Sequence, residues 1–258
     1  MSYFRRMSES TFETMDAVRG AWNPAEQHIA PPMGLAAHVL ERDHHARAQE
    51  PMLLSRIAFD ILGVLPIEPV EVSTRVIRPG RSIELAEATL SHGGRAALTA
   101  RGWFLRPGDT ARFAGDEFPA IPPRDQMHNV GMPKEWQGEF VKTVDVLAHV
   151  ERPGRGQFWI RPRVPLLEDE EISPTVRLLS IIDICNGLNP RLSPRDAAFP
   201  NLDLTADFFR EPEGEWIGVD GTVGYGARGI GLTHSVLHDD AGAFGVVTQS
   251  LTVRPLHP

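Results

Sequence analysis

The hydrophobic pattern of the chain alternates with period two in several stretches of about ten residues. In residues 201–210, Leu204 and Ala206 fall on one set of positions, whereas Asp203 and Asp207 fall on the other. Such alternation is typical of a strand with one buried face. The same pattern predicts strands at residues 53–62, 69–78, 82–91 and 95–105, and again at residues 201–210, 215–224, 229–238 and 244–254.

One helix is predicted ahead of each set of four strands. Residues 31–47 have a proline suited to the first turn, Pro32, and their apolar residues recur on one helical face. In the second half, Ser173 suits the N-cap and Pro174 the first turn. Apolar residues then recur with helical spacing until Asn186-Gly187, which favours a helix end.

The two halves resemble each other in sequence. Residues 55–92 align with residues 202–239 at a constant offset of 147, with a one-residue insertion near position 241, and the helices align at an offset of 142. Short connections between strands imply antiparallel pairing. The pattern therefore predicts an α+β architecture of two tandem helix-plus-sheet repeats. The expected boundaries are residues 1–106 and 140–258 for the repeats and residues 107–139 for a Pro-rich linker.

Composition narrows the function classes. The chain has 258 residues, a formal net charge of −8 and a single cysteine, Cys185. These values argue against nucleic-acid binding, an internal disulfide and a multi-cysteine metal site. No apolar run approaches the roughly 20 residues of a membrane span, and the N-terminus lacks the apolar core of a signal peptide. We therefore expect a cytoplasmic protein without a membrane partner.

Three stretches of the second half, PNLDLTADFFR, EWIGVDGTVGYGARG and VVTQSLTVRP, resemble the acyl-CoA thioesterase II (TesB-like) family and its thioesterase-like relatives. The resemblance implies a double hot-dog fold, with nearly the whole chain included. It also implies an acyl-CoA or another acyl thioester as substrate. Coenzyme A would enter only as part of that substrate, with no separate cofactor and no metal. Hot-dog proteins tend to associate, so a homodimer or larger homo-oligomer is expected.

The resemblance also implies catalytic residues. In the family, these three strands carry an Asp, a Thr or Ser, and a Gln that position a water against the thioester. The matching residues here are Asp203, Thr222 and Gln249. A carboxylate can accept the proton of the water, and an amide offers both a donor and an acceptor.

The first helix is the expected source of donors for the oxyanion, because backbone N–H groups at a helix N-terminus favour negative charge. Where the family leads us to expect a Gly-Gly turn, the chain has His28-Ile29-Ala30-Pro31-Pro32. Prolines have no N–H, so Met33 and Gly34 are the first candidate donors. His28 and Asn186 are further candidates for lining the substrate pocket.

The repeat predicts at most one water-activating site. At the repeat offset, and past the insertion, the first-half equivalents of Asp203, Thr222 and Gln249 are Arg56, Arg75 and Arg101. We expect these arginines either to hold phosphates of coenzyme A or to stabilise the sheet.

Two alternatives remain open. An enoyl-CoA hydratase of the hot-dog class would need a His close to an Asn-Pro, but Leu188 stands where that His is expected, before Asn189-Pro190. The second alternative is a hot-dog protein that binds acyl-CoA or lipid without turnover, which the altered HIAPP turn favours.

Overall fold

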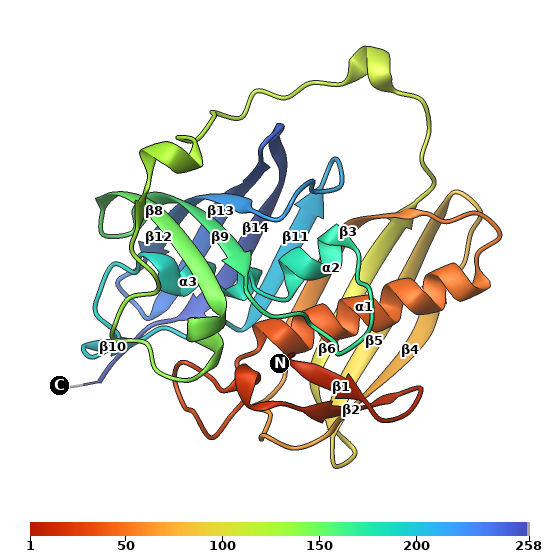
Figure 1. Ribbon diagram of the computed structural model, residues 1–258, viewed down its shortest axis with the longest axis horizontal. Helices are drawn as coiled ribbons and strands as arrows, with labels where there is room; N and C mark the ends of the chain where they lie inside the picture. Colours follow the sequence, from red (N-terminus) through yellow and green to blue (C-terminus); the bar gives the residue numbers. More distant parts are fainter. Residues whose placement is uncertain (257–258) are drawn as a thin grey trace.

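The computed structural model describes residues 1–256 and has an α+β architecture, as predicted (Figure 1). The helices lie on one side of a single antiparallel sheet, which has thirteen strands within the described residues. The strands of the first half are β1 (Phe4–Arg6), β2 (Thr11–Thr14), β3 (Leu53–Ile61), β4 (Val70–Arg78), β5 (Ile83–His92) and β6 (Arg95–Leu105). Those of the second half are β7 (His128–Asn129), β8 (Val144–Arg152), β9 (Arg155–Pro162), β11 (Asp203–Phe208), β12 (Ile217–Tyr225), β13 (Ile230–Asp239) and β14 (Gly242–Thr252). The short strands β10 (Ala197–Ala198) and β15 (Arg254–Pro255) form a separate pair.

The order of the strands reflects the internal repeat. It runs β1-β2-β4-β5-β6-β3-β11-β14-β13-β12-β9-β8-β7, so that β3 and β11 pair at the centre. These two strands are equivalent in the repeat, and Asp203 of β11 lies opposite Asp60 of β3. The eight predicted strands are all present, with ends within about three residues of those expected. Strands β1, β2, β7, β8 and β9, which widen the sheet on both sides, were not predicted, and neither was the separate pair β10 and β15.

Helix α1 (Ala30–Arg47) is continuous and crosses the sheet of the first half, as expected (Figure 1). Prolines occupy its first turn, and most of its residues up to Leu40 are buried. Gly34 allows the second helical segment to approach closely, because a Cβ at this position would lie 2.6 Å from the Cβ of Ser180. The small residues therefore bring the helices of the two halves into direct contact.

The second predicted helix is broken into three pieces, which corrects the expectation of one continuous helix. These are α2 (Pro174–Leu179), the 3₁₀ helix η5 (Ile182–Ile184) and α3 (Cys185–Leu188). The predicted N-cap is present, since the Ser173 hydroxyl accepts from the Val176 N–H. The Ser180 hydroxyl donates to the Arg177 carbonyl at 2.7 Å, and the Ile181 N–H bonds to the residue three before it rather than four. Such local competition for carbonyls and i+3 bonding tighten the turn that carries Asp183.

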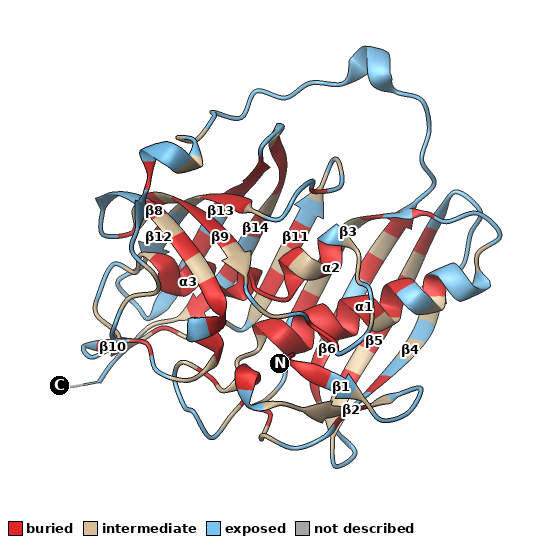
Figure 2. Ribbon diagram, in the orientation of Figure 1, coloured by how far each residue is buried: buried red, intermediate tan, exposed pale blue. Residues whose placement is uncertain are grey.

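The core lies between the helices and the sheet, where the facing side chains are buried (Figure 2). Residues beyond β6 form an exposed arch (Figure 2) that returns to the outer face of the sheet. There the Trp159 Nε1–H donates to the Pro122 carbonyl at 2.9 Å, and Phe118 stacks on Phe209. The linker thus crosses the surface of the body; its boundaries at residues 107–139 stay a prediction.

No helix among the described residues combines the length and apolar character needed to cross a membrane. Nor do these residues bring three or more His, Cys, Asp or Glu side chains together in a metal-binding group.

Candidate active site

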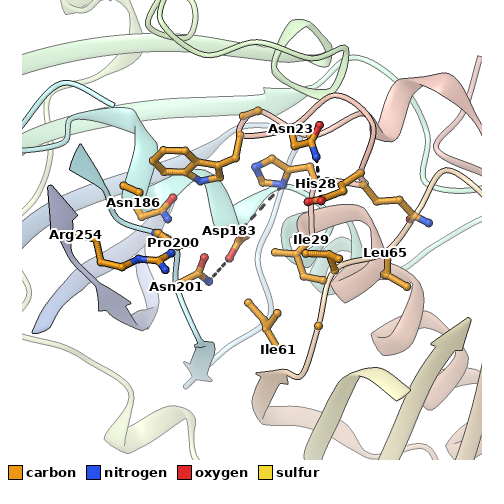
Figure 3. Close-up of a pocket in the computed structure, with 18 residues that line it drawn as sticks. Asn23, His28, Ile29, Ile61, Leu65, Asp183, Asn186, Pro200, Asn201 and Arg254 are labelled. Atoms are coloured by element: carbon orange, nitrogen blue, oxygen red, sulfur yellow. Dashed lines mark hydrogen bonds and ion pairs between the residues drawn. The ribbon is translucent and has the colours of Figure 1, made fainter. Parts of the chain in front are cut away.

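A cavity of about 360 Å³ lies between the loop that precedes α1, the broken helix of the second half and the chain that enters β11 (Figure 3). Its wall is mostly apolar, with side chains such as Ile29, Ile61 and Leu65, and it includes a small set of polar groups. The polar residues around it are Asn23, Glu26, Gln27, His28, Asp183, Asn186, Asn201 and Arg254. An apolar cavity with a few convergent polar groups is the usual form of a small-molecule site.

Asp183 places a buried carboxylate at this cavity, since its side chain is 4% exposed. One oxygen, Oδ1, accepts two hydrogen bonds, from Asn201 Nδ2 at 2.6 Å and from Gln249 Nε2 at 3.0 Å. The other oxygen, Oδ2, lies 4.0 Å from Nδ1 of His28. Burial raises the pKa of Asp183 to about 6, and the two amide hydrogen bonds oppose this rise.

Gln249 holds Asp183 through hydrogen bonds and is itself 1% exposed. Its Nε2 donates to both the carboxylate and the backbone carbonyl of Asp183. Its Oε1 accepts from the hydroxyl of Thr233 at 2.7 Å, on the neighbouring strand. Because Thr233 supplies a donor and Asp183 supplies acceptors, the orientation of this amide is determined by its partners.

Asn201 is the second amide at the carboxylate and, unlike Gln249, lines the cavity. Its Nδ2 donates to Asp183 and to the backbone carbonyl of Asp203 at 3.0 Å. Both partners are acceptors, and among residues 1–256 no donor bonds to the amide oxygen of Asn201, which can therefore accept from a ligand.

His28 stands opposite Asp183 in the wall of the same cavity (Figure 3). Its ring stacks on Phe140, with centroids 4.0 Å apart. Nδ1 accepts the N–H of Ala30 at 3.2 Å, so the ring proton resides on Nε2. Burial lowers the pKa of His28 to about 3, and the imidazole is therefore neutral and makes no ion pair with Asp183.

The expected convergence of Asp203, Thr222 and Gln249 is not observed. The carboxylate of Asp203 accepts from the backbone N–H of Ser250 at 2.6 Å and from its hydroxyl at 3.1 Å. Ser250 follows Gln249 in β14, and successive strand residues point to opposite faces, so Asp203 lies on the outer face of the sheet. Thr222 is exposed and pairs with His234, whereas its neighbour Val223 pairs with Thr233 on the inner face. The side chains of Asp203 and Thr222 therefore lie on the face of the sheet opposite to that of Gln249. In each strand, the next residue is the one that faces inward.

Met33 and Gly34 also differ from expectation. The N–H of Met33 donates within the helix, to the Ile29 carbonyl at 3.0 Å, and Gly34 packs against Ser180. Neither residue lines the cavity, whereas the other two candidates, His28 and Asn186, do.

The first half has no equivalent of this polar cluster. Thr233 pairs with Gln249, and its repeat equivalent Ala86 pairs with Gly102, so Gly102 and not Arg101 corresponds to Gln249. In the first half, Leu40 and Leu54 fill the space that corresponds to the Gln249 side chain, since a Cβ on Gly102 would lie 2.9 Å from a carbon of each leucine. The Asp183–Gln249–Thr233 cluster thus occurs once, in the second half, while the cavity beside it is lined by residues of both halves.

The arginines of the first half stabilise the sheet. Arg75 and Arg101 both bind the buried carboxylate of Glu87, at 2.6 Å and 2.7 Å. Arg56 lies 3.8 Å from Asp207. This favours the structural one of the two roles considered from the sequence.

Asp183 was not identified from the sequence as a candidate carboxylate, and Asn201 and Thr233 were also missed. One signal was available: Asp203 alternates with Leu204, on the polar set of positions that also holds Asp207. Gln249, in contrast, falls on the apolar set of positions in its strand, together with Val247 and Leu251. Their opposite phases indicated opposite faces of the sheet.

Comparison with known proteins identifies the family. The model of the acyl-CoA thioesterase C-terminal domain matches residues 119–253, and that of the N-terminal domain matches residues 18–105. No curated protein sequence matches the chain.

Several solved structures share the fold. A hot-dog-fold protein from Alicyclobacillus acidocaldarius superposes with a TM-score of 0.73 at 13% identity, over 98% of this chain and 96% of that one. The tesB protein of Mycobacterium avium subspecies paratuberculosis gives 0.69 at 12% identity, with coverage of 98% and 96%. Acyl-CoA thioesterase II of Mycobacterium marinum gives 0.66 at 17% identity, with the same coverage. The chain therefore belongs to the acyl-CoA thioesterase family and has a double hot-dog fold.

Proposed function

We propose that this protein hydrolyses acyl thioesters by direct attack of water, with Asp183 as the general base. One observation carries the proposal: the buried carboxylate of Asp183 has one oxygen held by two amide donors and the other directed to the cavity. Its pKa of about 6 suits the task, because a base with a pKa near the working pH is ionised and still basic enough to accept a proton.

The residues suggest how the water is held. It would donate one hydrogen to Asp183 Oδ2 and the other to the free amide oxygen of Asn201, leaving a lone pair for the carbonyl carbon. Gln249 would not touch the water, because its amide is occupied by Asp183 and Thr233. Its proposed role is to position the carboxylate.

The reaction balances without a further reactant. Water oxygen bonds to the thioester carbon as Asp183 takes a proton, and the carbonyl oxygen becomes an oxyanion. The intermediate collapses, the carbon–sulfur bond breaks, and the leaving thiolate takes up the proton from Asp183. The products are a carboxylic acid and a free thiol, and no metal or redox cofactor is required. Membership of the family supports acyl-CoA as the thioester.

A panel of acyl-CoAs with chains from acetyl to palmitoyl tests this function by release of free thiol. We expect turnover on at least one of them, with saturation kinetics. An acyl carrier protein thioester of the same chain length shows which carrier is preferred. The measurement also tests a non-catalytic alternative, which the lack of a free N–H in the first four residues of α1, Ala30–Met33, favours. That alternative predicts saturable binding without thiol release from any substrate.

The hydratase alternative finds less support. The Asn189 amide donates to the carbonyls of Arg152 and Arg155, at 2.7 Å and 3.1 Å, and does not line the cavity. No His occupies the expected position beside it.

The pH dependence of hydrolysis should show a single limb. Asp183 must be ionised to act as a base, so kcat/KM is expected to rise tenfold per pH unit below about pH 6 and to level off above it. His28 adds no second limb, because with a pKa of about 3 it stays neutral throughout this range. Initial rates between pH 4.5 and pH 9 check this. A profile with no change across pH 6 would contradict the assignment of Asp183.

A further inference from the structure

Hydrolysis of a thioester requires hydrogen-bond donors for the oxyanion, and none of the first four residues of α1, Ala30–Met33, has a free N–H. Pro31 and Pro32 have no N–H. The N–H of Ala30 is bonded to His28 Nδ1, and that of Met33 is bonded to the Ile29 carbonyl. Residues near the cavity other than these must therefore supply the donors.

Two side chains in the cavity wall have donors without a protein partner. The Asn186 side chain lines the cavity and, although the residue is only 8% exposed, its amide makes no hydrogen bond to any residue from 1 to 256. His28 carries its proton on Nε2, and this N–H likewise has no acceptor in the described chain. Neither donor is among the fully buried polar atoms that lack a partner, so both are accessible from the cavity and can bind a ligand oxygen.

We infer that His28 and Asn186 together form the oxyanion hole of this enzyme, as donors from the Nε2–H of a neutral imidazole and from a side-chain amide. This inference rests on the proposed thioesterase function. His28 and Asn186 line the same cavity as Asp183, and both also line a smaller cavity next to it, so the two donors share one wall. Asp183 lies three residues before Asn186 in the broken helix, which brings the base and this donor to one substrate carbonyl.

The surroundings of His28 keep it in the form that the role requires. Stacking on Phe140 holds the plane of the ring, and the Ala30 N–H occupies Nδ1, so the proton stays on Nε2. A doubly protonated, cationic ring would instead form an ion pair with Asp183 Oδ2, which lies 4.0 Å from Nδ1, and would weaken that carboxylate as a base. A neutral imidazole can polarise the thioester carbonyl without weakening Asp183 as a base.

Two variants test the inference on the acyl-CoA that the wild-type protein hydrolyses fastest. Asn186→Ala removes the amide and leaves the start of α1 untouched. His28→Ser removes the imidazole but keeps an oxygen that can accept the Ala30 N–H. Each is expected to lower kcat by about a hundredfold or more, as observed when one oxyanion donor is removed. KM should change by less than about fivefold, and the midpoint of the pH profile should stay near that of the wild type.

A spectroscopic readout separates this role from a structural one. The same acyl-CoA, labelled with ¹³C at the carbonyl, is bound to Asp183→Asn, where turnover is slow. Adding His28→Ser or Asn186→Ala should move the carbonyl stretch to higher wavenumber, because a donor to the carbonyl oxygen is lost.

The outcomes distinguish this inference from the function on which it rests. Thioesterase activity in the wild type, with kcat within threefold of it in both variants and an unchanged carbonyl stretch, would overturn the oxyanion hole alone. A wild-type protein that releases no thiol from any acyl-CoA would overturn the proposed function instead. Thr222→Ala, on the outer face of the sheet, serves as the control and should match the wild type.

Discussion

Replacement of Asp183 by asparagine is expected to lower kcat for thioester hydrolysis by at least about a hundredfold, since general-base catalysis contributes roughly 10²–10⁴ to rates. Asparagine has the same shape, and its amide oxygen can still accept from Asn201 and Gln249. What it lacks is the ability to take a proton from water. The rate of thiol release at pH 8 measures the effect, with enzyme concentration verified by absorbance.

Thermal stability is the control for Asp183→Asn, because this substitution is not expected to destabilise the folded state. Burial raises the pKa of Asp183 from 3.8 to about 6, so the folded state disfavours the ionised carboxylate. The ionised carboxylate therefore lowers the free energy of unfolding. This loss is absent below about pH 4 and complete above about pH 6, where it amounts to roughly 3 kcal/mol at 1.36 kcal/mol per pKa unit. Asp183→Asn should therefore melt at the same temperature as the wild type at pH 4 and at an equal or higher temperature at pH 8.

Matched variants outside the cavity sharpen the comparison. Asp203→Asn and Thr222→Ala change residues on the outer face of the sheet and are expected to keep kcat within about threefold of the wild type. Loss of activity in Asp203→Asn together with normal activity in Asp183→Asn would sink the assignment of the base.

Replacement of Arg210 by methionine is expected to lower the free energy of unfolding by about 3–5 kcal/mol, because it leaves a buried charge without its partner. The side chain of Asp239 is 1% exposed and receives both terminal nitrogens of Arg210, at 2.5 Å and 2.7 Å. Arg210 also donates to the carbonyls of Gly242 and Ala243, so it closes the turn between β13 and β14. Urea unfolding followed by tryptophan fluorescence measures the loss.

Arg56→Met is the matched control, since it also removes an arginine from an Asp partner. Arg56 and Asp207 are both exposed and lie 3.8 Å apart, and such surface pairs contribute about 0–1 kcal/mol. An equal loss of stability in the two variants would show that burial of Asp239 is not the cause.

The alternating pattern determined the strands because it depends only on which face of each strand is buried. All eight predicted strands are present, and the duplication is visible in the central pairing of β3 with β11. Two hairpins were missed: β1 and β2 are short, with three and four residues, whereas β8 and β9 have nine and eight residues but lie in a part of the chain that was assigned no strand. The break within the second helix was also missed, because the apolar spacing continues through it.

The sequence by itself determined the α+β class and the resemblance to the thioesterase family, and it marked Gln249 as a candidate site residue, because local pattern and motif carry that information. Only the tertiary structure decided which carboxylate meets that amide. Asp203 is 46 residues from Gln249 and Asp183 is 66, and sequence distance does not distinguish them. The register of β11 against β14 directs Asp203 to the outer face of the sheet. The 3₁₀ turn in the broken helix places Asp183 within hydrogen-bond distance of Gln249. Which polar groups share a buried space depends on strand register and helix packing, and these exist only once the two halves of the chain have come together.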